Sequence, residues 1–213
     1  MKMKEVEIVK GGLKLSGLLA VPEKATGIVL FAHGSGSGRL SSRNQFVART
    51  LIEGGIAILL LDLLTPAEEA IDEMTRELRF DIPLLAQRLM MASDWVKEQP
   101  ETKTLKIGYF GASTGAAAAL IAAAKRKDVA AVVSRGGRPD LAQTALSQVK
   151  SPTLLIVGGA DFGVIELNEA AFNQLNCIKK LEIVPHATHL FEERGALESV
   201  SKHALQWFLS YVK

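Results

Sequence analysis

The alternation of apolar runs with helix-like segments is the feature that most constrains how this chain can fold. Six predominantly apolar runs read as buried strands: residues 27–32, 56–61, 105–110, 129–134, 152–157 and 180–185. Such strands belong in a parallel sheet that helices cover on both sides. Two alternating segments, 3–9 and 13–21, come first and flank a pair of glycines, which indicates an antiparallel hairpin. The sequence therefore predicts an α/β fold with a doubly wound, mostly parallel eight-stranded sheet and helices on both faces.

The segments between these runs have the periodicity of helices. The predicted helices are residues 41–53, 82–98, 113–125, 138–148, 164–175 and 192–212. Residues 63–80 are acidic and weakly periodic, and they form the one stretch where a small flap could lie. No other stretch leaves room for a substantial lid domain. With 213 residues and no linker, the chain is expected to form a single domain, 1–213.

Composition argues against several classes of function. The net charge is +2 and no basic face dominates, so we expect neither nucleic acid nor a membrane surface as a partner. The single cysteine, Cys177, excludes an internal disulfide and a cysteine-based metal site, and it should be a small buried apolar residue. The sequence has no signal-peptide core and no bilayer-spanning run, so we expect a reducing cytoplasm. No nucleotide-binding glycine motif follows a strand, and we expect neither a metal nor a cofactor.

A G-x-S-x-G pentapeptide, Gly111 to Gly115, lies between a predicted strand and an alanine-rich helix. A turn this tight leaves no room for a Cβ atom two residues before or after the serine, so both positions need glycine. The turn holds the hydroxyl of Ser113 at the end of the sheet, beside a helix N-terminus whose N–H groups can receive an oxyanion. The bare pattern also occurs by chance. Its position between a strand and a helix is what predicts that Ser113 is a nucleophile.

A serine nucleophile needs a base, and the chain has four histidines. His33 follows the first parallel strand, His186 and His189 follow the last strand, and His203 lies within a predicted helix. The carboxyl ends of parallel strands share one edge of the sheet. His186 lies at the strand end, whereas His189 lies further into the loop and can reach Ser113 while its other nitrogen binds a carboxylate. We therefore favour His189 as the base, with His186 as the alternative.

The carboxylate that orients this base should come from an earlier strand end. Asp161 follows a buried strand and two glycines, one strand–helix unit before His189. It could instead cap the helix that follows it. Asp140 is the alternative acid, and Asp62 is expected to organise its own loop. The predicted triad is Ser113, Asp161 and His189, in this order along the chain.

With nucleophile, acid and histidine in this order, the chain resembles the α/β-hydrolase superfamily over nearly its whole length. Three stretches are much like those of the small, lidless dienelactone-hydrolase-like group: residues 31–36, 152–161 and 187–192. The resemblance implies an α/β-hydrolase fold and an oxyanion hole in the loop that begins with His33 and Gly34. Dienelactone hydrolase proper has a cysteine at the nucleophile position, where this chain has Ser113. This departure from the family pattern favours an ester or thioester over dienelactone itself as the substrate.

An oxyanion hole needs two rigid donors, and backbone N–H groups can supply them. One should be the N–H of Thr114, directly after the nucleophile. The second should come from Ser35 or Gly36, where glycines let the backbone approach a substrate. The loop could instead be merely flexible. His33 is expected to hold this loop in shape and not to act as a base, and it is a candidate substrate-binding residue.

Four arginines fall in loops or first turns near the predicted catalytic edge: Arg39, Arg43, Arg135 and Arg138. Arg135 and Arg138 follow a buried strand, so one of them could bind a substrate carboxylate or phosphate, which suits the guanidinium fork. The alternative is an ion pair with Asp140, Glu166 or Glu192, and we favour this alternative.

The sequence thus predicts a serine hydrolase that cleaves small or medium carboxylic esters, thioesters or lactones through an acyl-enzyme on Ser113. Its partner would be a small-molecule substrate. A small peptidase would use the same three residues. A catalytically silent scaffold that acts as a binding module is the alternative from a different class of function.

Overall fold

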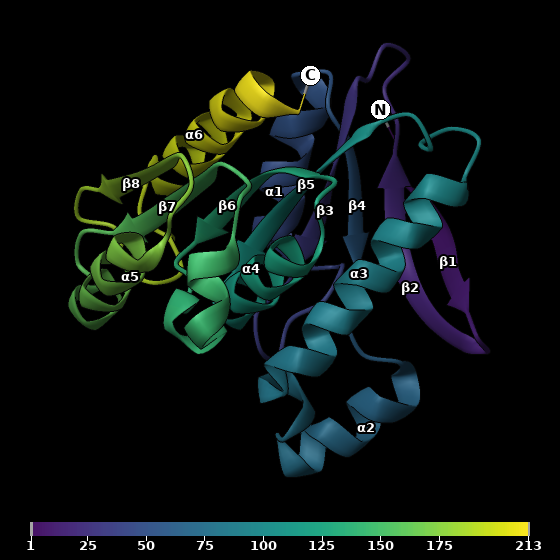
Figure 1. Cartoon of the computed structure of the whole chain (residues 1–213), viewed down its shortest axis with the longest axis horizontal. Helices are drawn as coiled ribbons and strands as arrows, with labels where there is room; N and C mark the ends of the chain where they lie inside the picture. The colour runs from purple at the N-terminus through teal and green to yellow at the C-terminus, as the bar shows by residue number, and fades with distance from the viewer. Residues whose placement is uncertain (1, 213) are drawn as a thin grey trace.

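Eight strands form one sheet in the order β1-β2-β4-β3-β5-β6-β7-β8 (Figure 1). This is a computed structural model, and it describes residues 2–212. The strands are β1 (Lys4–Lys10), β2 (Leu13–Ala20), β3 (Gly27–Ala32), β4 (Ala57–Leu61), β5 (Lys106–Ala112), β6 (Val129–Arg135), β7 (Thr153–Gly158) and β8 (Lys179–Val184). The pairs β1–β2 and β2–β4 are antiparallel, and the pairs from β4–β3 through β7–β8 are parallel. The predicted mostly parallel eight-stranded sheet is confirmed.

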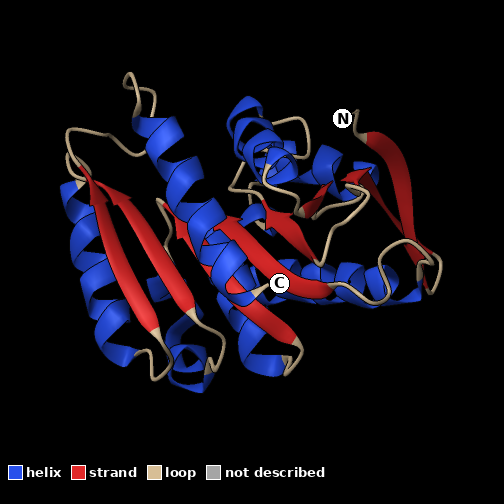
Figure 2. Ribbon diagram, turned by 90° about the horizontal axis from the view of Figure 1, so that it is seen from above, coloured by secondary structure: helices blue, strands red, loops and turns tan. Residues whose placement is uncertain are grey.

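Helices cover both faces of this twisted sheet (Figure 2). The helices are α1 (Ser42–Glu53), α2 (Pro66–Thr75), α3 (Ile82–Glu98), α4 (Thr114–Lys125), α5 (Phe162–Gln174) and α6 (Ala196–Tyr211), with 3-10 segments η1 (Leu78–Phe80) and η2 (Pro139–Gln148). Helices α1 and α6 pack on one face, and α3, α4 and α5 pack on the other with η2. Each layer buries its own apolar cluster against the sheet, as expected because the central strands β3, β4 and β7 are buried on both faces.

Small residues set how closely these layers approach. Helix α4 is buried along almost its whole length, and its alanines let its axis lie near the sheet. On the opposite face, a Cβ at Gly108 of β5 would lie 2.9 Å from the ring of Phe208 on α6. The centre of the sheet is therefore packed tightly on both sides, which gives β5 a rigid base for the residues at its carboxyl end.

The structure differs from the prediction in two segments. Residues 63–80, read as irregular, contain helix α2 and the short η1. The Thr65 hydroxyl accepts the N–H of Glu68, and the Glu68 carboxylate accepts the N–H of Thr65, a capping box whose sequence signature was missed. Residues 138–148, predicted as an α-helix, form 3-10 turns because the backbone breaks at Gln143, with φ of 49°.

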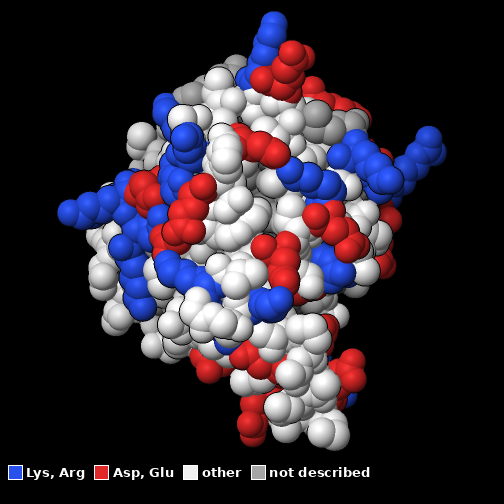
Figure 3. Space-filling model, turned by 90° about the vertical axis from the view of Figure 1, so that its right-hand side faces the viewer, with Lys and Arg blue, Asp and Glu red and all other residues white. Residues whose placement is uncertain are grey.

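The α2–η1 segment projects from the body of the molecule, at the bottom of Figure 3. Ion pairs hold it: Arg88 of α3 binds Glu68 and Arg79 binds Asp72. Arg79 also keeps the pKa of Asp72 below its ordinary value, against the effect of burial. Over the face shown in Figure 3, Lys and Arg alternate with Asp and Glu instead of forming a field of one sign.

Candidate active site

Ser113 forms the sharp turn between β5 and α4. Its backbone has φ of 50° and ψ of −122°, a combination that costs energy for a residue with a Cβ. The Ser113 N–H donates to the carbonyl of Arg135 on the neighbouring strand β6, at 3.2 Å. These features place the serine at the carboxyl end of β5, directly before the first residue of α4. The geometry is that of a nucleophile elbow.

The two glycines of the pentapeptide have a direct steric cause. A Cβ at Gly111 would lie 2.4 Å from the Cα of Ala116, and a Cβ at Gly115 would lie 2.2 Å from the carbonyl oxygen of Ala32. Contacts under about 3 Å are not tolerated between such atoms. The structure therefore gives the reason, expected from the sequence, that both positions are glycine.

His189 and Asp161 meet at the same edge. The Nδ1 of His189 lies 2.7 Å from Oδ2 of Asp161, which leaves Nε2 of the ring available to a hydroxyl. Although Asp161 precedes α5 directly, its side chain makes no capping hydrogen bond. The alternatives are placed elsewhere: His186 is exposed after β8, and Asp140 binds Arg138.

A cavity of about 230 Å³ brings the predicted nucleophile and base together. Ser113 and His189 both line it, with Ser35 of the loop after β3 and Arg135 at the end of β6. The packing around it is close, since a Cβ at Gly34 would touch the Cβ of Ser113 at 3.0 Å. The serine, the histidine and the Gly34 loop therefore face one common space.

The loop after β3, where the sequence predicts an oxyanion hole, makes a tight turn. The Ser37 N–H donates to the carbonyl of Gly34, and Gly36 has a positive φ of 66°, which closes a tight turn. Within residues 2–212, the N–H groups of Ser35 and Gly36 have no backbone acceptor. Thr114 begins α4, so its N–H points out of the helix N-terminus beside Ser113. Ser35 borders this cavity, whereas Gly36 borders a neighbouring one.

His33 holds this loop against the segment that follows β4. Its Nε2 accepts the N–H of Leu63 at 3.0 Å, so Nδ1 carries the proton and donates to the carbonyl of Gly34 at 2.9 Å. Burial lowers the pKa of His33, although nearby acidic groups oppose the shift. The neutral ring therefore clamps two loops, and both of its nitrogens are occupied.

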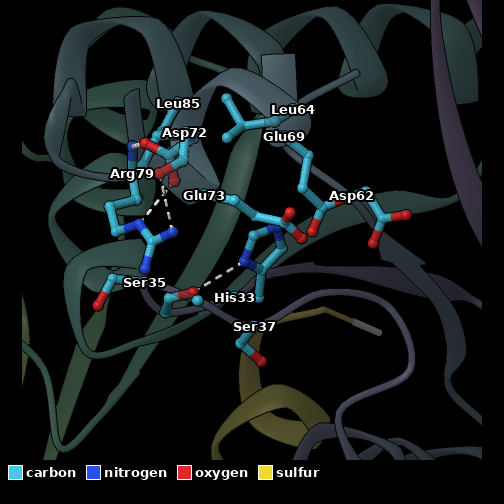
Figure 4. A pocket seen from close by; sticks show the side chains of 12 residues that line it. His33, Ser35, Ser37, Asp62, Leu64, Glu69, Asp72, Glu73, Arg79 and Leu85 are labelled. Atoms are coloured by element: carbon cyan, nitrogen blue, oxygen red, sulfur yellow. Dashed lines mark hydrogen bonds and ion pairs between the residues drawn. The ribbon is translucent and has the colours of Figure 1, made fainter. Parts of the chain in front are cut away.

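A second cavity, of about 240 Å³, lies between the Gly34–Ser37 loop and the α2–η1 segment (Figure 4). Its walls include His33, Leu64 and the carboxylates of Glu69 and Glu73. Arg79 reaches across from η1, and a Cβ at Gly36 would lie 3.4 Å from its Nη1. The sequence did not assign these flap residues to the site, because the helix that carries them was not recognised.

The four arginines have different surroundings. Arg138 binds Asp140, Arg43 binds Glu192, and Arg39 binds Asp62. The first two are pairings of the kind favoured from the sequence. Arg135 has no carboxylate partner among the described residues, and it alone of the two predicted substrate-binding arginines lines the cavity with Ser113.

Neither a metal-binding cluster nor a membrane-spanning helix is present in residues 2–212. No group of three or more His, Cys, Asp or Glu side chains is arranged to hold a metal ion in this range. No helix in it has the length and apolar character needed to cross a bilayer.

Known proteins of similar sequence and structure match nearly the whole chain. The model of the dienelactone hydrolase family matches residues 15–212. A crystal structure of dienelactone hydrolase from Anabaena variabilis is 58% identical, with a TM-score of 0.97 and full coverage of both chains. Est1E from Butyrivibrio proteoclasticus is 19% identical, with a TM-score of 0.80 over 97% of this chain and 98% of that one, which shows the shared fold.

Curated relatives are longer than this chain. A protein of Mycobacterium tuberculosis named "Putative phosphoribosyl transferase" is 55% identical over 209 residues. The match covers 98% of this chain and 46% of that protein, so the chain spans about half the length of its curated relatives. The matching family model, together with the sheet order and the elbow at Ser113, shows that the chain belongs to the dienelactone hydrolase family of α/β-hydrolases.

Proposed function

We propose that this protein is a serine hydrolase that cleaves small carboxylic esters, thioesters or lactones. The observation that carries the proposal is the cavity that Ser113 and His189 share, with Asp161 bound to the far nitrogen of that histidine. A hydroxyl becomes a nucleophile when an oriented imidazole can accept its proton. The family's hydrolases and the esterases of the same fold support the reaction type.

In the proposed reaction, Ser113 Oγ attacks the acyl carbon while Nε2 of His189 takes its proton. Asp161 keeps Nδ1 protonated and stabilises the imidazolium. The negative charge that forms on the carbonyl oxygen is received by the N–H groups of Thr114 and of Ser35 or Gly36. His189 then gives its proton to the leaving oxygen or sulfur. Water, deprotonated by the same nitrogen, releases the acid from the acyl-enzyme and returns the proton to Ser113.

We do not extend the phosphoribosyl transferase name to this chain, because the match covers less than half of the proteins that carry it. The serine at the elbow also separates the chain from a cysteine-dependent dienelactone hydrolase. Ester and thioester substrates fit a hydroxyl nucleophile, and the small cavity favours short acyl groups.

The test is hydrolysis of 4-nitrophenyl esters of increasing acyl length by the wild type, Ser113→Ala, His189→Ala and His186→Ala. We expect activity that is highest for short acyl chains and is lost in the first two variants, with His186→Ala close to the wild type. Turnover that persists in Ser113→Ala would contradict the assignment of Ser113 as the nucleophile. Loss of activity confined to His186→Ala would contradict the assignment of His189 as the base. If the wild type cleaves no ester, thioester or peptide, the hydrolase proposal fails and the catalytically silent binding module is favoured instead.

A further inference from the structure

Arg135 is a buried guanidinium without an acidic partner. The residue is 8% exposed, and among the described residues its guanidinium makes one hydrogen bond, a long bond from Nη2 to Oδ1 of Asn44 at 3.5 Å. The Nε and Nη1 atoms are buried and have no partner within residues 2–212. Burying a charge in this way is costly unless something compensates it. By contrast, the half-buried guanidinium groups of Arg39 and Arg79 do bind carboxylates.

The surroundings of Arg135 add positive charge. Arg43 of α1 lines the same cavity, and its carboxylate partner, Glu192, lies largely in solvent. Burial lowers the pKa of Arg135 to about 10, with a contribution from the charge of Arg43, so the group remains cationic at neutral pH. No Asp or Glu is among the described residues that line this cavity.

The N-terminus of α1 faces the same space. Ser41, the cap of this helix of 12 residues, lines the cavity with Arg43 in the first turn. The first N–H groups of a helix carry partial positive charge and favour an anion nearby. Two guanidinium groups and a helix N-terminus therefore converge on one cavity, and Ser113 lies in its wall.

We propose that Arg135 binds an anionic group of the substrate, a carboxylate or phosphate that lies close to the scissile carbonyl. The residue is adjacent to the nucleophile: its carbonyl accepts the N–H of Ser113, and its strand position is level with Ala112. A cavity of about 230 Å³ holds both the reacting carbonyl and the anion, so few bonds can separate them. Half-esters of short diacids fit this description. The proposal rests on the hydrolase function proposed above and narrows its substrate class.

A matched pair of esters tests the proposal: mono-4-nitrophenyl succinate, which carries a carboxylate, and its methyl ester, which does not. In Arg135→Met we expect kcat/KM for the anionic ester to fall ~10- to 100-fold, mainly through KM, as for loss of charge-assisted hydrogen bonds. The methyl ester should change less than about threefold, since a group outside the reacting atoms leaves the chemical step alone. Arg135→Lys keeps the charge without the guanidinium fork, so its kcat/KM for the anionic ester should lie between those of the wild type and Arg135→Met. Arg49→Met, which removes an exposed charge from the same helix α1, should change neither ester.

If kcat/KM falls equally for both esters in Arg135→Met, Arg135 acts at the reacting centre or in folding, and the proposal is overturned. An unchanged kcat/KM for both esters would overturn it as well.

A second experiment needs no turnover. It measures by calorimetry how succinate and inorganic phosphate bind to the wild type and to Arg135→Met. Binding that Arg135→Met abolishes supports the site, and the tighter anion identifies carboxylate or phosphate. Equal binding, or none to the wild type, contradicts it. If the wild type hydrolyses neither ester, the hydrolase proposal fails, and this arm alone decides the anion site.

Discussion

The pair of Asp161 and His189 is the interaction on which the proposed chemistry depends most at the residue scale. The 2.7 Å contact holds the imidazole in the tautomer whose Nε2 is free of a proton. Replacement by asparagine keeps the shape but can hold the wrong tautomer. In the proposed reaction, the carboxylate also stabilises the imidazolium that forms when the serine is deprotonated.

We therefore expect Asp161→Asn to lower kcat for a short 4-nitrophenyl ester by ~1,000-fold or more, with little change in the unfolding midpoint. Asp140→Asn, which removes the partner of Arg138 and the alternative acid, is the matched control and should stay within about threefold. A larger loss of kcat in Asp140→Asn than in Asp161→Asn would reverse the assignment.

The neutral clamp of His33 predicts a pH dependence of stability. The pKa of His33 in the folded protein lies below its ordinary value of 6.5, because burial disfavours the charged ring. Below pH 6.5 the unfolded chain therefore binds more protons than the folded protein. The stabilisation is complete above this pH and is lost as the pH falls toward the folded pKa, since a proton on Nε2 would displace the N–H of Leu63.

We expect the free energy of unfolding to fall more steeply below pH 6.5 in the wild type than in His33→Gln, by up to ~1.4 kcal/mol per pH unit. Urea unfolding between pH 7.5 and 5 measures both slopes. The wild type and His33→Gln differ at this one residue, so the difference between the two slopes isolates His33. Parallel slopes would show that the clamp does not depend on the neutral ring.

At the scale of elements, the contact of α4 with β3 fixes the elbow. Gly115 lies where a Cβ would meet backbone oxygens of Ala32 and His33, which cannot move without displacing the strand. Gly115→Ala should therefore destabilise the protein by about 3 kcal/mol, as overpacking does at rigid sites, and should reduce activity. Gly163→Ala, in an open position of helix α5, is the control and should not destabilise it. The midpoints of urea unfolding compare the two, and similar midpoints would contradict the close packing.

Strands could be predicted from the sequence more reliably than the segments between them. The apolar runs predicted the strands correctly, because a strand buried on both faces, such as β7, is apolar along its whole length. The edge strand β8 is half-exposed, but it still has enough apolar residues to be recognised. Helix α2 was missed because its apolar residues Ile71 and Met74 face solvent and blur the periodicity. Its capping box, Thr65 to Glu68, was the available signal. The break of η2 at Gln143 has no such signal, since a positive φ there is not written in the residue type.

At the scale of the whole molecule, the sheet order brings residues 113, 161 and 189 to one edge from three different strand ends. This convergence could be predicted, because parallel strands in this fold present their carboxyl ends together. The surroundings of each arginine could not be predicted from the sequence. Which carboxylate meets which guanidinium depends on side-chain geometry between distant segments, as with Arg43 and Glu192. For the same reason, the sequence could not predict that Nε and Nη1 of Arg135 have no hydrogen-bond partner within residues 2–212.

The central claim is that Ser113 is an activated nucleophile, and covalent labelling tests it most directly. We expect a fluorophosphonate to add one equivalent of mass to the wild type, with the modified peptide containing Ser113. Ser113→Ala should take up no label, and His189→Ala should react far more slowly, because its serine lacks a base. Prior incubation with a 4-nitrophenyl ester that forms the acyl-enzyme should slow labelling. A wild type that stays unlabelled, or a label on another residue that persists in Ser113→Ala, would contradict the account.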